Sequence, residues 1–226
     1  ELDKLAELSI KTGVALQQGQ DLLITAPLEA APLVRRLTFH AYQQGCGIVT
    51  PFYTDPEVTL LRYKTASKES FDKSTDWLFD AMGVAFDQNT ARLAVVGEDP
   101  MLLSGQNADH IGRANQAVSK ASSPVRERIT RFDVNWNIIA WPGTQWAKRV
   151  FPNLEGGEAQ MQLAKAIFQA SRLEGKDPIV NWKLHNKNLR ERTNWLNAKN
   201  FAALHFYGEG TDLKVGLADG HEWMGG

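Results

Sequence analysis

Four short apolar runs along the chain alternate with segments whose apolar residues recur at helical spacing. The runs cover 22–26, 47–53, 92–97 and 136–141, and glycine, proline or polar residues bound them. Two parallel neighbouring strands need a crossover connection, which is usually a helix. Strands that are covered on both faces of the sheet are apolar throughout. The pattern therefore predicts an α/β fold, a layered parallel sheet with helices on both faces.

The segments between these runs predict helices. An amphipathic helix opens the chain over 2–13, and a second begins at Pro27 and Glu29 and ends near Gly45. Proline is tolerated in a first helical turn, and a carboxylate suits the positive end of the helix dipole. Further helices are predicted over 60–66, 75–85, 108–120, 144–149 and 158–172.

The pattern changes after Pro178. A charged amphipathic helix is predicted over 179–198, and two short runs, 203–207 and 213–217, then flank a glycine-rich connection. Such a connection predicts an antiparallel hairpin, with Val215 and Gly216 in a paired strand, and strict alternation in the second run predicts that this strand is half-exposed.

A hairpin by itself is only marginally stable, so we expect this one to be the first piece of a second, truncated domain whose remainder is absent. The predicted organisation is an α/β amino-terminal domain over 1–178, a connecting helix over 179–200, and the start of a carboxy-terminal domain over 201–226.

Charge and composition narrow the classes of partner. The 25 basic and 26 acidic residues leave a net charge of −1, which argues against a nucleic-acid partner. No apolar run approaches the roughly 18 residues of a membrane span, and no signal peptide opens the chain, so we expect no membrane association and a cytoplasmic location. Cys46 is the single cysteine and is interpreted as a small packing residue.

The loops lack the motifs of common α/β enzymes. Phosphate binding after the first strand needs glycines, whereas this chain has Ala26-Pro27-Leu28-Glu29 there, with a carboxylate where phosphate would lie. The glycines around Cys46 precede a strand instead of following one. Neither a Walker loop nor a nucleophile elbow is present, since Ser104 lacks the required preceding glycine.

The histidines offer no metal-binding pattern either. His221-Glu222 begins like a His-Glu-x-x-His zinc helix, but Gly225 replaces the second histidine, so a loop is expected. The other four are His40, His110, His185 and His205, and no pair of them has the i, i+4 spacing. We therefore assign no catalytic residue and no metal ligand to this chain, and its substrate-binding residues stay unassigned.

Several spaced segments nevertheless resemble one known family. They are 150–152, 158–172, 177–182 and 196–206, then Gly208-Glu209-Gly210-Thr211-Asp212-Leu213-Lys214-Val215-Gly216-Leu217 and 221–226. These segments, together with the opening block 2–25, are similar to the aminopeptidase T and aminopeptidase S family of thermophilic metalloproteases. The resemblance covers essentially the whole chain.

The resemblance implies a metal-dependent aminopeptidase that removes the amino-terminal residue from a peptide substrate. It also implies an amino-terminal α/β domain followed by a catalytic domain that holds two divalent metal ions (zinc, cobalt or manganese), and a homodimer. Paired metals would clamp the free amine and the carbonyl and lower the pKa of a bridging water.

The family's first metal-binding glutamate follows shortly after the glycines that correspond to Gly225 and Gly226. We therefore expect this chain to lack the metal ligands, to be inactive alone, and to contribute a wall of the substrate chamber and part of the dimer interface. The alternative is a standalone α/β binding or interaction module without catalysis.

Overall fold

The computed structural model describes residues 1–175 and 177–225. Two compact units divide the chain, Glu1–Gly175 and Lys176–Gly226. Gly226, the last residue of the predicted segment 201–226, lies outside the described residues. The predicted domain ranges stay a prediction, and each unit is described separately below.

The first unit is built on a four-stranded parallel sheet, as predicted. Its strands are β1 (Leu22–Pro27), β2 (Val49–Thr54), β3 (Ala91–Val96) and β4 (Trp136–Ala140), in the order β2-β1-β3-β4. Each strand lies within two residues of a predicted apolar run. The central strand β1 is almost wholly buried, whereas the edge strand β2 is mostly exposed.

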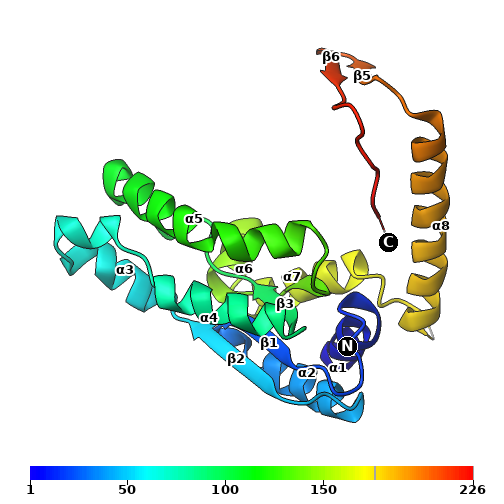
Figure 1. Cartoon of the computed structure of the whole chain (residues 1–226). Coiled ribbons are helices and arrows are strands. Elements are labelled where there is room, and N and C mark those ends of the chain that lie inside the picture. Colours follow the sequence, from blue (N-terminus) through cyan, green and yellow to red (C-terminus); the bar gives the residue numbers. More distant parts are fainter. Residues whose placement is uncertain (176, 226) are drawn as a thin grey trace. The chain divides into compact units, whose positions relative to one another are not determined.

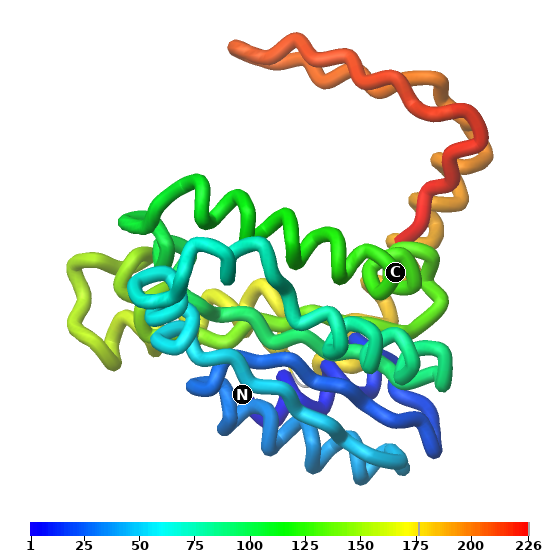
Figure 2. Tube along the Cα trace, turned by 60° about the vertical axis from the view of Figure 1, so that its left-hand side comes forward, coloured from blue at the N-terminus to red at the C-terminus, as the bar shows by residue number. Residues whose placement is uncertain are grey.

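Helices cover both faces of this sheet (Figures 1 and 2). The helices α1 (Leu2–Leu8) and α2 (Ala31–Gln43) lie on one side, and α4 (Asp76–Asp87) and α5 (Ala108–Thr130) lie on the other. Successive side chains of a strand point to opposite faces. Accordingly, Leu23 packs with Met82, Phe86 and Val125 of α4 and α5, and its neighbours Leu22 and Ile24, both fully buried, point to the opposite face.

Two arginines fix α5 against its neighbours. Arg113 makes an ion pair with Asp72, which ends the short 3-10 helix η3 (Lys68–Asp72). Arg128 pairs with Asp87 at the end of α4, with 2.7 Å between Nε and Oδ1. Both pairs are bidentate hydrogen bonds, the strongest geometry that a carboxylate offers.

Three helices differ most from their predicted form or bounds. The opening helix ends at Leu8 and continues as a π-helical turn, η1 (Ser9–Gly13). The helix α3 (Pro56–Thr65) begins four residues before its prediction, because Asp55 caps it by accepting from the backbone N–H of Glu57. The helix α5 runs to Thr130 instead of Lys120 and contains Pro124.

A smaller cluster lies beyond the β4 edge of the sheet. The helices α6 (Thr144–Val150) and α7 (Gly156–Ala170) follow β4 and pack on each other through a buried group of residues. That group consists of Ala147, Ala159, Leu163 and Ile167, with Ala140 of β4 and Trp146 packed against it. The residues Trp141, Pro142 and Gly143 join β4 to α6.

The second unit consists of one long helix and a hairpin. The helix α8 (Pro178–Lys199) is capped by Asp177, whose carboxylate accepts from the backbone N–H groups of Ile179 and Val180. The strands β5 (Ala203–Gly208) and β6 (Thr211–Gly216) pair antiparallel, with Leu204 opposite Val215. The predicted hairpin is therefore confirmed.

The predicted half-burial of the second hairpin strand is wrong. All six residues of β6 are exposed, and the apolar pair Phe206 and Leu213, directly opposite each other, are 51% and 52% exposed. The alternation places apolar side chains on one face as expected, but nothing among the described residues buries that face.

Candidate functional site at the carboxyl edge of the sheet

The carboxyl ends of the strands are where α/β sheets bind ligands, at the point where the strand order reverses. Here that point lies between β1 and β3, since β2 lies on one side of β1 and both later strands lie on the other. Three loops meet at this edge. They begin at Leu28 after β1, at Gly97 after β3 and at Trp141 after β4.

Glu29 occupies the first of these loops. Its Oε2 accepts hydrogen bonds from the backbone N–H of Thr144 at 3.3 Å and from the Thr144 hydroxyl at 3.1 Å. Thr144 is the first residue of α6, so the carboxylate lies at the positive end of that helix. Glu29 therefore caps the start of α6 and joins the loop after β1 to the segment after β4.

The loops after β3 and β4 approach each other too closely to hold a ligand between them. A Cβ atom at Gly143 would overlap the carbonyl oxygen of Gly97, and one at Gly97 would overlap the carbonyl oxygen of Trp141. Only glycine permits this backbone contact. The edge is therefore closed between β3 and β4.

Acidic residues after β3 are held by neighbouring groups. Glu98 accepts a hydrogen bond from the Thr54 hydroxyl at 3.2 Å. Asp99 accepts from the backbone N–H of Met101 and, more weakly, from Arg149; these bonds hold the pKa of its carboxyl below the usual range. Each carboxylate thus has a structural partner, which argues against a free acid–base pair here.

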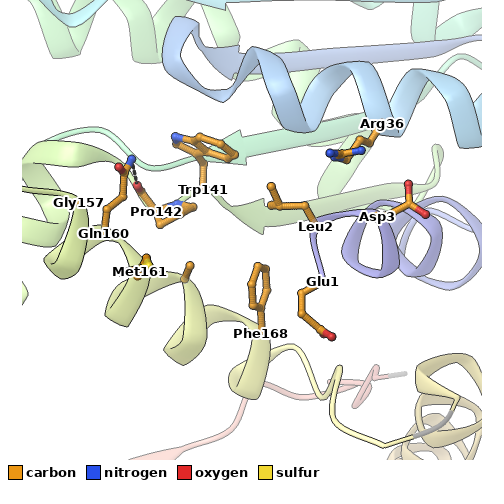
Figure 3. A pocket seen from close by; sticks show the side chains of 11 residues that line it. Glu1, Leu2, Asp3, Arg36, Trp141, Pro142, Gly157, Gln160, Met161 and Phe168 are labelled. Carbon is orange, nitrogen blue, oxygen red and sulfur yellow. Dashed lines mark hydrogen bonds between the residues drawn. The ribbon is translucent and has the colours of Figure 1, made fainter.

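An open cavity of about 570 Å³ lies beside the end of β4, between α7 and the start of α1 (Figure 3). Its walls are mostly apolar and come from Leu2, Trp141, Pro142, Met161, Ala164 and Phe168. Trp141 is 9% exposed, and its Nε1 has no hydrogen-bond partner among the described residues. The charged residues Glu1, Asp3 and Arg36 stand on the rim. This is the candidate binding site of the first unit.

Each histidine has a partner that explains its place. His110 stacks on Phe71 at 4.4 Å between ring centroids, whereas the adjacent Asp109 pairs with Arg113. His185 makes an edge contact with Trp182, as its helical spacing predicts. The His221 segment is not helical, and the His221 ring bonds the carbonyl of Ala218.

Two histidine–aspartate pairs could not be predicted from the sequence. His40 on α2 lies 3.1 Å from Asp3 on α1, and His205 on β5 lies 2.6 Å from Asp212 on β6. The first pair depends on how two helices pack. The hairpin register, which places Asp212 opposite Tyr207 and next to His205, could have suggested the second.

A metal centre does not fit the described residues. Within 1–175 and 177–225, no group of three or more His, Cys, Asp or Glu side chains could hold a metal ion. Burial and the nearby Asp21 carboxylate raise the pKa of the Cys46 thiol, which disfavours its nucleophilic thiolate form. None of the helices in the described part of the chain is long and apolar enough to cross a membrane.

Comparison with known proteins identifies the class as a peptidase. The family model described as thermophilic metalloprotease (M29) matches residues 1–226. The chain belongs to this family, which confirms the predicted resemblance.

The relatives carry aminopeptidase names. Aminopeptidase T of Thermus thermophilus is 46% identical over 225 residues, which cover 100% of this chain and 55% of that protein. Aminopeptidase 2 of Geobacillus stearothermophilus is 36% identical over 226 residues and is covered to the same 55%. The solved structure of wild-type AmpT from Thermus thermophilus superposes with a TM-score of 0.92 at 45% identity, covering 100% of this chain and 55% of that one. The chain thus spans about half the length of the relatives it matches.

Proposed function

We propose that this chain is the amino-terminal part of a metal-dependent aminopeptidase that removes the amino-terminal residue from peptides. The observation that supports the proposal most strongly is the similarity over the full chain to proteins named aminopeptidases, at up to 46% identity. The fold supports it too, since the whole chain superposes on the structure of wild-type AmpT with a TM-score of 0.92.

The metal centre is proposed to lie outside residues 1–226. The family description implies metal use, yet the described residues contain no group that could hold an ion. About 45% of each relative has no counterpart in this chain, which leaves ample length for a ligand set. We expect two divalent ions there, held by carboxylate and imidazole side chains.

The proposed role of the first unit is structural. In support, the Glu29 bond to α6 and the Gly97–Gly143 contact commit its carboxyl edge to contacts within the fold. We propose that it forms a wall of a chamber for short peptides, within a homodimer, in the cytoplasm.

Metal content and activity of two polypeptides test this proposal. The whole protein encoded by the gene should hydrolyse leucine p-nitroanilide after addition of zinc, cobalt or manganese, and a chelator should abolish the activity. The polypeptide 1–226 should show neither hydrolysis nor stoichiometric metal by elemental analysis. One or two tightly bound ions per 226-residue chain would refute the assignment, and a whole protein that never cleaves amino-terminal amides would favour a binding module.

A further inference from the structure

A second cavity continues the one beside β4. It has a volume of about 470 Å³ and adjoins the first along α2, since Asp3 and Arg36 line both cavities. Figure 3 shows Arg36 extending from α2 across from Trp141 and Phe168. The second cavity adds Arg35 and Phe39 to the walls. We call the whole feature the α2 groove.

Its two ends differ in chemistry. The end between Trp141, Met161 and Phe168 is an apolar chamber, and the other end holds two arginines on adjacent positions of α2. A ligand that filled only the chamber would leave the arginines unused, whereas a simple anion would leave the chamber without an occupant.

The charges of the groove are unequally matched. Glu1 lies 3.3 Å from Lys4, and Asp3 lies 3.1 Å from His40, so both carboxylates have partners. Neither Arg35 nor Arg36 makes an ion pair or hydrogen bond within the described part of the chain. The groove therefore presents two arginines without an ion-pair partner in the described part of the chain, beside an apolar chamber.

We propose that the α2 groove binds the carboxy-terminal apolar residue of a peptide. The side chain fills the chamber against Trp141, and the terminal carboxylate pairs with Arg36, supported by Arg35. Guanidinium groups bind carboxylates through two parallel hydrogen bonds, and mostly apolar clefts with a few polar groups are typical ligand sites. The peptide class rests on the function proposed above, but the groove itself does not depend on catalysis.

Binding of a blocked peptide to the whole protein tests the proposal. Acetyl-Ala-Ala-Leu has no free amine for an aminopeptidase to act on, and prior treatment with chelator removes metal that could bind its carboxylate. By calorimetry, the free acid should bind about tenfold more tightly than the same peptide with a carboxamide end, because the amide removes the charge. Acetyl-Ala-Ala-Ser should also bind about tenfold more weakly, since it leaves the chamber unfilled.

A matched pair of variants assigns the effect to the groove. Arg36→Gln should weaken binding of the acid about tenfold and abolish the difference between acid and amide. Lys165→Gln removes the same charge from α7, which lines the chamber, but Lys165 does not face it, so binding should be unchanged. Repeating the Arg36→Gln and Lys165→Gln comparison with metal present guards against loss of structure on chelation.

Three results would overturn the proposal. They are equal affinity for acid and amide, equal behaviour of the two variants, and a structure of the whole protein with another part of its own chain in the groove. Hydrolysis of leucine p-nitroanilide is measured separately. Peptide binding without hydrolysis would support the proposed groove and reject the proposed function. Hydrolysis without peptide binding would support the proposed function and reject the groove.

Discussion

The Glu29 carboxylate joins the loop after β1 to the first residue of α6, Thr144, which lies 115 residues further along the chain. Both hydrogen bonds that Thr144 donates, from its backbone N–H and its hydroxyl, end on one carboxylate oxygen. The interaction satisfies a backbone donor at a helix start and places a negative charge at the positive end of the dipole.

Replacing Glu29 by alanine should lower the free energy of unfolding by about 0.5–1 kcal/mol, because an exposed helix-capping carboxylate is lost. Urea denaturation monitored by circular dichroism measures the change. Glu29→Gln keeps an acceptor oxygen and should lose less than half as much. If both the alanine and the glutamine variant were as stable as the wild-type protein, Glu29 would have no capping role.

The contact between Gly97 and Gly143 predicts a larger effect. A methyl group at Gly143 would overlap backbone atoms of Gly97, which cannot move aside as a flexible side chain can. Gly143→Ala should therefore lower the free energy of unfolding by about 1–3 kcal/mol.

Gly112→Ala is the matched control for that substitution. Gly112 lies inside α5 with open space around its missing Cβ, so alanine there should raise the free energy of unfolding by about 0.5–1 kcal/mol. The two glycine substitutions should thus have opposite signs in the same denaturation assay. A stable Gly143→Ala variant would show that the loops can separate without cost.

The two arginine–aspartate pairs on α5 predict a pH dependence. Hydrogen bonds from Arg113 hold the pKa of Asp72 below its usual range, and Arg128 does the same for Asp87. A carboxylate with a lowered folded-state pKa stabilises the fold above its unfolded pKa, about 3.9, and that stabilisation is lost as pH falls through the folded pKa.

Carbon-13 NMR titration of the Asp87 carboxyl measures this directly. In Arg128→Gln the pKa of Asp87 should rise toward its usual value, and the stability of the variant should decline less steeply below pH 4. Arg131→Gln removes a neighbouring charge that pairs with Glu127 at 3.6 Å and should leave Asp87 unchanged. An Asp87 pKa that is the same in all three proteins would contradict the assigned cause.

The fold could be predicted from the sequence wherever burial alone decides the pattern. The continuous apolar runs at 22–26 and 92–97 correspond to the inner strands β1 and β3, which are mostly buried because both faces of a parallel sheet are covered. Helix ends were less predictable. In α5 the turns after Lys120 include Pro124, yet they stay helical because Val125 packs on the sheet and Arg128 pairs with α4.

The site was less predictable because its contacts join distant segments. Glu29 was expected to favour the helix that follows it, but its carboxylate instead bonds the start of α6. Similarly, the sequence does not reveal the close approach of Gly143 to Gly97. Neighbouring residues in the sequence predict neither contact, because each depends on which loops the topology brings to the same edge of the sheet.

The exposed face of the hairpin gives the last prediction. Phe206 and Leu213 lie opposite each other and are about half exposed in the 226-residue chain. In that polypeptide Phe206→Ser should change the free energy of unfolding by less than about 0.5 kcal/mol, as for other surface positions. If the remaining part of the proposed aminopeptidase packs on this face, the same substitution in the whole protein should cost about 3–5 kcal/mol, the range for a large core side chain.

Lys214→Ala, on the opposite face of the hairpin, is the control and should be neutral in both proteins. Differential scanning calorimetry of the four variants measures the contrast, and an equal, small effect of Phe206→Ser in both proteins would show that the hairpin face stays open to solvent.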